Sequence, residues 1–202
     1  MTQADVYTHT CISKMIDKVI EGYHATILVY GQTGAGKTYT MDGFHYSLND
    51  KHNRPRIDNS EKDNWGIIPR SISYLFNKIS NESILRQRQY TVNCSYLQIY
   101  NERIYDLLNS SQLSQIDPAA SGLKLRYRAG NFTVDNLYTF ECKSAQDVYL
   151  LLQFGLKNRA VAGHKLNRTS SRSHSILCLT IESFDKETQV NNSNILGWLF
   201  NE

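Results

Sequence analysis

A glycine-rich turn between an apolar run and a potential helix constrains the fold of this chain more than any other feature. Residues 31–38 read GQTGAGKT, the pattern G-x-x-x-x-G-K-T. The run before it, residues 25–30 (ATILVY), is apolar and rich in β-forming residues. It predicts a strand that is central in an α/β sheet and covered on both faces. With a helix expected after Lys37, the order strand, turn, helix is the context that a phosphate-binding loop requires.

The glycines of this turn allow a tight backbone path that directs successive N–H groups inward, toward a ligand of pyrophosphate size. Lys37 would place its ammonium between phosphates, and the Thr38 hydroxyl would take one position on Mg²⁺. The sequence therefore predicts that the chain binds a nucleotide with Mg²⁺; the alternative is a chance turn with an exposed lysine. The candidate nucleotide-binding residues of the motif are Gly31, Gln32, Thr33, Gly34, Ala35, Gly36, Lys37 and Thr38.

Composition narrows the class of protein. Of 202 residues, 41% are hydrophobic and 20% charged, as in a globular domain. The longest apolar runs reach about six residues, against roughly 20 for a membrane span, and the first twenty residues lack a signal-peptide core. The net charge of +3 is too small to argue for nucleic acid. The four cysteines form no C-x-x-C pair and are expected to be buried free thiols.

Hydrophobic periodicity predicts alternating helices and strands. Helices are expected over residues 4–21, from about 68, and over 144–160, where Ser144 and Asp147 suggest a capped start. Strands are expected over 91–100 and 175–184, with a helical turn over 101–108. Polar loops are expected over 42–64 and 109–122, and short strands and turns over 123–143.

A second polar cluster, residues 167–174 (NRTSSRSH), lies between an expected helix and an expected strand. Alone, it could be a solvated turn. The order of GQTGAGKT followed by YTM, then YLQIYNERIYDLL, then Asn158 and Arg159, then NRTSSRSH, resembles the kinesin motor domain over residues 3 to about 184.

This resemblance implies a three-layer α/β P-loop domain whose activity is ATP hydrolysis coupled to movement on microtubules, in the cytoplasm on the cytoskeleton. The second cluster would be switch I, which closes over the γ-phosphate. Ser171 would then bind on the Mg²⁺ side and Ser170 lie near the attacking water, while Asn167 would shape the loop and Arg172 pair with a switch II glutamate. Tyr39 takes the family position that packs against adenine, with a core aromatic as the alternative.

The chain also departs from the family pattern. It begins directly in the first helix, without a strand carrying R-x-R-P, and D-x-x-G-S-E (switch II) does not occur after residue 184. In the family the switch II strand lies beside the phosphate-loop strand. We therefore expect an incomplete motor domain over residues 1–184, a tail over 185–202 outside the family, and poor stability of the chain alone. The apolar residues of the tail are expected to have no place to pack: Ile195, Leu196, Trp198, Leu199 and Phe200.

These departures leave two functions open. One is a microtubule-stimulated ATPase, and the other is a non-catalytic product that binds nucleotide weakly or acts as a structural decoy; a generic P-loop kinase or GTPase is a distant third. Tubulin is the expected partner, with no nucleic acid or membrane, and the oligomeric state is open. The basic stretch Lys124, Arg126 and Arg128 with Tyr127 is either a secondary contact with acidic tubulin or a solvated strand edge.

Overall fold

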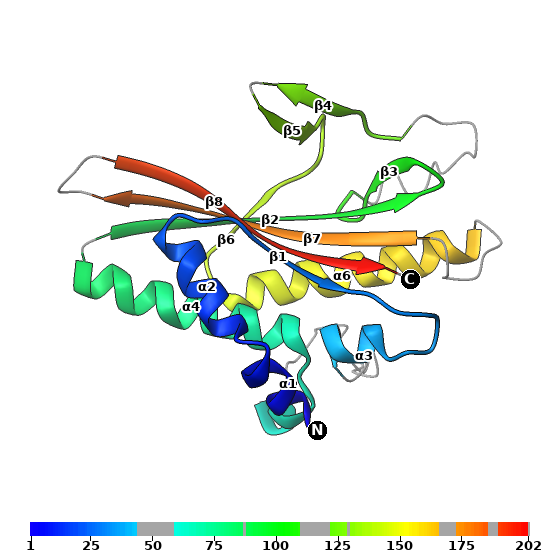
Figure 1. The fold of residues 1–202 in the computed structure, drawn as a ribbon. Helices are drawn as coiled ribbons and strands as arrows, with labels where there is room; N and C mark the ends of the chain where they lie inside the picture. The colour runs from blue at the N-terminus through cyan, green and yellow to red at the C-terminus, as the bar shows by residue number, and fades with distance from the viewer. Residues whose placement is uncertain are drawn as a thin grey trace.

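The computed structural model describes residues 1–43, 59–86, 88–109, 122–128, 130–165, 173–185 and 190–201. A six-stranded mixed sheet forms its centre, in the order β1-β8-β7-β2-β3, with β6 pairing with β2 (Figure 1). Strands β4 and β5 form a separate two-stranded ribbon. The strands are β1 (Ala25–Val29), β2 (Arg88–Tyr100), β3 (Arg103–Asp106), β4 (Leu125–Arg128), β5 (Asn131–Val134), β6 (Phe140–Cys142), β7 (Ser173–Asp185) and β8 (Val190–Asn201).

The described helices lie on one side of the sheet, and the β4–β5 ribbon stands off its other side (Figure 1). The described residues thus supply the sheet and one helical layer of an α/β fold. The helices are α1 (Gln3–His9), α2 (Ile12–Glu21), α3 (Lys37–Asp42), α4 (Ile67–Arg86) and α6 (Ala145–Lys165), with a 3₁₀ helix, η1, over Asn59–Asn64. None of the described helices is long and apolar enough to cross a membrane.

The phosphate-loop strand β1 lies at the edge of the sheet, so the expectation of a central strand covered on both faces is wrong. In the described part of the chain β1 pairs with β8 alone, in parallel. Ile27 faces the helices and is buried, whereas Leu28 is 56% exposed and Tyr30 is 82% exposed. The apolar run correctly indicated a strand, but the number of its neighbours was not encoded in it.

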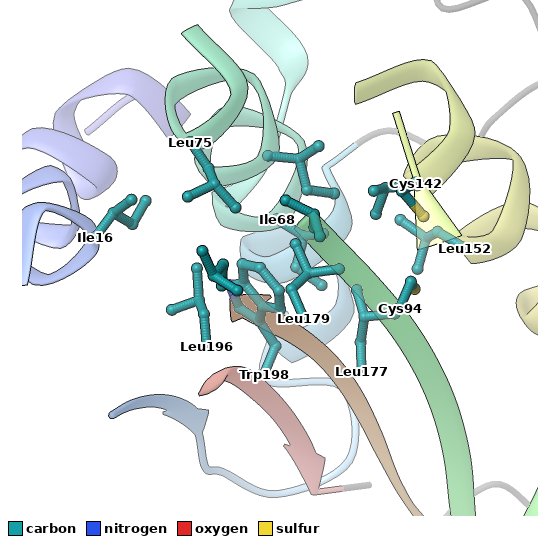
Figure 2. Packing of buried hydrophobic residues seen from close by; sticks show 14 of the residues in the cluster. Ile16, Ile68, Leu75, Cys94, Cys142, Leu152, Leu177, Leu179, Leu196 and Trp198 are labelled. Carbon is teal, nitrogen blue, oxygen red and sulfur yellow. The ribbon is translucent and has the colours of Figure 1, made fainter. Parts of the chain in front are cut away.

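The expectation that the apolar tail residues have no place to pack is wrong for Leu196 and Trp198. Residues 190–201 form β8, which pairs antiparallel with β7 along its length and parallel with β1. Leu196 and Trp198 are fully buried. In Figure 2 they point from the sheet toward Ile68 and Leu75 of α4 and Ile16 of α2. The sheet therefore continues beyond residue 184, and β8 takes the place beside β1 where the resemblance puts the switch II strand.

The first expected helix is two helices, because the chain breaks at Cys11, whose φ of 54° is left-handed. Just before the break, the hydroxyls of Thr8 and Thr10 donate to the carbonyls of Ala4 and Val6 at 2.9 and 2.7 Å. Such back-bonding lets side chains replace continued helical hydrogen bonds. Gly22 follows α2 with a φ of 124°, so the helix ends at Glu21, the expected last residue of the range 4–21.

The segment after β2 is a hairpin rather than the expected helical turn. Tyr100 pairs with Arg103 across a two-residue turn, and β3 continues antiparallel to β2. The turn residues Asn101 and Glu102 both have positive φ, 48° and 61°, which suits the right-handed twist of a hairpin.

The other expected elements are confirmed, with shifted ends. The α4 helix carries Pro69 in its first turn, and α6 starts with reciprocal bonds between Ser144 and Asp147 but runs to Lys165. Of the expected free thiols, Cys94 and Cys142 are buried, whereas Cys11 is exposed. Most of the expected loops over 42–64 and 109–122 lie outside the described residues.

Candidate nucleotide-binding site

The glycine-rich turn follows the carboxyl end of β1 and leads into α3. Gly34 and Gly36 have φ of +83° and +85°, in the left-handed region. A Cβ added at either glycine would meet nothing within 4 Å. The turn therefore needs glycine for its backbone conformation rather than for space. Residues 32–35 are exposed, so this turn is accessible to a ligand.

Lys37 is folded back over the turn instead of extending into solvent. Only 8% of it is exposed, and its Nζ donates hydrogen bonds to the carbonyls of Gly31 and Gln32 at 2.8 and 2.9 Å. The exposed lysine of the alternative interpretation is therefore wrong. An ammonium held by two loop carbonyls can exchange them for phosphate oxygens, which bind a cation more strongly.

The short helix α3 is held at its far end by the segment before α4. The N–H of Gly66 donates to the carbonyl of Asp42 at 3.3 Å, and Gly43 forms an isolated bridge with Trp65. A Cβ on Gly43 would lie 2.2 Å from the Asn64 carbonyl oxygen, so the two backbones approach closely here. On α3 itself, Thr38 is half-buried and Tyr39 is 52% exposed, so the reading of Tyr39 as a core aromatic is wrong.

The predicted residues of the second cluster, Asn167, Ser170, Ser171 and Arg172, lie outside the described residues. The strand that follows them is described. Val29 of β1 is level with Phe200 of β8, and Phe200 is level with Ser175 of β7. Because neighbouring strands are spaced about 4.8 Å apart, β7 begins about 10 Å from the residue where β1 ends. The phosphate loop and the start of β7 therefore lie at the same end of the strands.

A buried polar group, the hydroxyl of Tyr96, lies near this end of the strands and was not predicted. Tyr96 of β2 is fully buried, and burial raises the pKa of its hydroxyl to about 12. Arg159 of α6 and Ser175 lie next to that hydroxyl, and Asp42 of α3 contributes to its electrostatic environment. A Cβ on Gly155 of α6 would lie 2.2 Å from the Tyr96 ring. A lone glycine inside a helical pattern was the sequence signal for this close approach.

Among the described residues, no group of three or more His, Cys, Asp or Glu side chains is placed to hold a metal ion. Thr38, in the first turn of α3, supplies a hydroxyl oxygen next to the loop. This donor chemistry suits Mg²⁺, which keeps several waters and binds through substrate phosphates.

Comparisons with known proteins identify the family. A family model described as "Kinesin motor domain" matches residues 1–198. The chain belongs to the kinesin motor domain family. The match extends into β8, beyond residue 184.

Individual kinesins are similar over nearly the whole chain. "Kinesin-like protein KIF15" of Strongylocentrotus purpuratus is 39% identical over 96% of this chain, and its Homo sapiens counterpart is 38% identical over 95%. "Kinesin-like protein KIN-12E" of Arabidopsis thaliana is 40% identical over 84%. A solved structure described as "Structure of a fast kinesin: Implications for ATPase mechanism and interactions with microtubules" superposes with a TM-score of 0.81 at 34% identity, over all of this chain. The α/β fold expected from the resemblance is thereby confirmed.

The matched region is a small part of those proteins. This chain spans 12 or 13% of the length of the three kinesin-like relatives and 50% of the chain in the solved structure.

Proposed function

We propose that this kinesin-family chain binds ATP with Mg²⁺ at the loop of residues 31–38, as the nucleotide-binding part of a microtubule motor. One observation carries the proposal: the loop has the left-handed glycines and the inward-folded Lys37 of a phosphate cradle, in a chain that matches the kinesin motor domain over residues 1–198.

The described residues fit such a ligand. The loop backbone is exposed and no side chain fills the space at Gly34 or Gly36. Lys37 would bind the phosphates, and Thr38 would be a ligand of Mg²⁺. The metal would supply neutralisation of the charge on the phosphates. Half-exposed Tyr39, two residues beyond Lys37, would contact the adenine.

For the second cluster we carry over the roles that the family resemblance implies. Ser171 would join Thr38 on the Mg²⁺ side, and Ser170 would orient the attacking water. Asn167 would shape the loop, and Arg172 would act as the latch toward switch II. The strand order supports these roles. The start of β7 lies at the same end of the strands as the end of β1, which brings the last residues of the cluster toward the phosphate loop.

Nucleotide affinity of the whole chain tests the proposal. Lys37→Ala is compared with Lys14→Ala, which removes an exposed lysine near the start of α2. We expect Lys37→Ala to weaken binding of a fluorescent ATP analogue by about 100-fold, since it removes a charge-assisted contact to phosphate. Lys14→Ala should bind like the wild type. Equal binding by all three proteins, or no binding by the wild type at millimolar ATP, would contradict the proposal.

The microtubule is the proposed partner, which places the chain on the cytoskeleton in the cytoplasm. The exposed β4 strand carries Arg126 and Arg128 after Lys124 on the ribbon that stands off the sheet (Figure 1). The ring of Tyr127 lies 4.8 Å from that of Phe132, between centroids. Arg126 is engaged by Asp135 at 2.8 Å, so Lys124 and Arg128 carry more of the available positive charge.

Co-sedimentation at low salt separates a tubulin contact from a solvated strand edge. Lys124→Glu with Arg128→Glu should reduce the fraction of protein that pellets with microtubules, because acidic tubulin then meets like charge. The matched control is Lys14→Glu with Lys157→Glu, which makes the same charge change on the helices. Equal pelleting of both double variants would support the solvated-edge interpretation.

A second candidate function is a nucleotide-binding chain without hydrolysis. It is favoured by the composition of β8, which lies beside β1 and contains no acidic side chain that could help to hold a Mg²⁺ ion. Phosphate release, measured with and without microtubules, decides between the two: stimulated turnover excludes the second candidate, and ATP binding without turnover supports it.

A further inference from the structure

Gln3 makes a hydrogen bond that connects the first helix to the nucleotide-binding helix. Its side-chain Nε2 donates to the carbonyl oxygen of Tyr39 at 2.6 Å, across 36 residues of sequence. Only 5% of Gln3 is exposed, although it is a polar residue in the first turn of α1. A buried amide at this position is costly unless its hydrogen bond is made.

The first turn of α1 is itself fixed by a capping box. The Thr2 hydroxyl accepts from the N–H of Asp5 at 3.1 Å, and the Asp5 carboxylate accepts from the N–H of Thr2 at 2.8 Å. The hydrogen bonds to Thr2 hold the pKa of Asp5 below its ordinary value. Gln3 therefore extends from a rigid turn, and its amide meets Tyr39 at little cost in conformational freedom.

The Tyr39 carbonyl, which accepts this bond, belongs to the short helix α3, which depends on contacts with other parts of the chain. Helix α3 has six residues, too few for stability without outside contacts. The Tyr39 carbonyl also accepts the N–H of Gly43 at 2.9 Å, so Gln3 adds a second donor at the end of α3. Lys37 and Thr38 lie in the first turn of the same helix. A contact that fixes Tyr39 thus fixes the backbone that carries the phosphate-binding side chains.

We propose that Gln3 is a positioning residue for nucleotide binding, which acts by holding the Tyr39 carbonyl so that α3 keeps the orientation that binds phosphate. Gln3 would act through the Tyr39 backbone rather than by contact with the nucleotide. The inference rests on the proposed nucleotide site and adds to it a dependence on the N-terminal helix.

The decisive variant is Gln3→Met, which keeps the length and volume of the side chain and removes the donor. The matched control is Gln89→Met, the same change at an exposed position of β2. Two quantities are measured on the whole chain: the Kd for the ATP analogue, and amide hydrogen exchange of residues 37–43 without nucleotide. We expect Gln3→Met to raise the Kd about fivefold and to speed exchange in residues 37–43, with β2 unchanged. Gln89→Met should change neither quantity.

A merely structural role for Gln3 predicts a different pattern. Loss of packing in α1 would speed exchange in residues 3–9 and leave residues 37–43 and the Kd as in the wild type, and that pattern would overturn the inference. If the wild type binds the ATP analogue and Gln3→Met has the same Kd, the inference about Gln3 is overturned, while the proposed nucleotide site still stands. If the wild type does not bind ATP, both proposals fail. Gln3→Glu provides a second variant, because its carboxylate repels the Tyr39 carbonyl and should raise the Kd at pH 7.5 more than Gln3→Met does.

Discussion

Two neighbouring rows of side chains cross the same four strands of the sheet, one on each face. The row that faces the helices is at most 8% exposed and consists of Tyr96, Leu177, Trp198 and Ile27. The row on the opposite face is equally apolar and consists of Leu97, Ile176, Leu199 and Leu28. On that face, exposure rises from 8% at Leu97 to 56% at Leu28. Composition therefore does not determine which face is buried; what packs against each strand does.

Among the described residues, the opposite face is covered only at its β3 end. Asp106, level with Leu97, is fully buried, and its carboxylate accepts the N–H of Tyr138 at 2.7 Å. The segment before β6 thus lies over this corner of the sheet, while the β1 end of the same face has no comparable contact among the described residues. The two faces make separate demands on their residues, and the following substitutions measure the difference.

The largest difference is expected between adjacent residues of β8. Trp198→Ala removes a fully buried indole on the helix-covered face and should lower the free energy of unfolding by about 3–5 kcal/mol. Leu199→Ala, one residue along on the partly exposed face, should cost about 1 kcal/mol. Urea unfolding followed by circular dichroism measures both. Equal losses would mean that the opposite face is as well packed as the core.

The second pair of substitutions compares two glycines. Gly155→Ala would place a methyl group 2.2 Å from the buried ring of Tyr96, and we expect a loss of about 3 kcal/mol from this overpacking. Gly197→Ala, on the opposite face of β8, would meet its nearest atom, the Cys178 Sγ, at 3.8 Å. That is an ordinary contact, so Gly197→Ala should be neutral or slightly stabilising. Thermal unfolding measures both variants. A lower melting temperature for Gly197→Ala than for Gly155→Ala would show that there is space for a methyl group between α6 and Tyr96.

A third substitution tests the covered corner of the opposite face. Asp106→Ala leaves the N–H groups of Leu108 and Tyr138 without their acceptor, and we expect a loss of about 2 kcal/mol. Asp106→Asn retains one acceptor and should cost less. A loss below about 0.5 kcal/mol for the alanine variant would mean that water reaches this corner.

The same carboxyl gives a pH dependence of known sign. Burial raises the pKa of Asp106 above its ordinary value, against the opposing effect of three backbone hydrogen bonds. Between the ordinary and the raised pKa the native state binds more protons than the unfolded state, so this group's contribution to stability falls as pH rises through that interval. The wild type should therefore gain stability relative to Asp106→Asn on going from about pH 7 to about pH 4. A constant difference across that range would contradict the raised pKa.

Local signals in the sequence predicted what local forces determine. The reciprocal bonds of Ser144 and Asp147, the end of α2 at Gly22 and the strand before the phosphate loop were all predicted because each depends on residues within a few positions. The hairpin at Asn101 and Glu102 was missed, since glutamate seldom takes a positive φ. The strand β8 was missed because an apolar run without alternation needs a partner to be recognised as a strand.

The candidate site divides in the same way. The loop motif predicted a tight turn that needs glycine, because that conformation is local to residues 31–38. The hydrogen bonds of Lys37 to the loop carbonyls were not predicted. The hydrogen bond from Gln3 to Tyr39 joins residues 36 positions apart, and no pattern in either segment indicates it. The contact of Gly155 with Tyr96 joins a helix to a strand. It was not predicted, and a lone glycine in a helical pattern was its one signal in the sequence.

The smallest expected effect is the strictest test of the comparison. Leu28→Ser exchanges an apolar side chain for a polar one at a position that is 56% exposed, beside the phosphate loop. If the β1 end of the opposite face is open to water in solution, the free energy of unfolding should fall by no more than about 0.5 kcal/mol. Ile27→Ser, one residue earlier on the helix-covered face, should cost several times more, because it buries a hydroxyl in place of an alkyl group. A loss of about 2 kcal/mol for Leu28→Ser would show instead that this row is covered in solution, and the difference between the two faces would then disappear at β1.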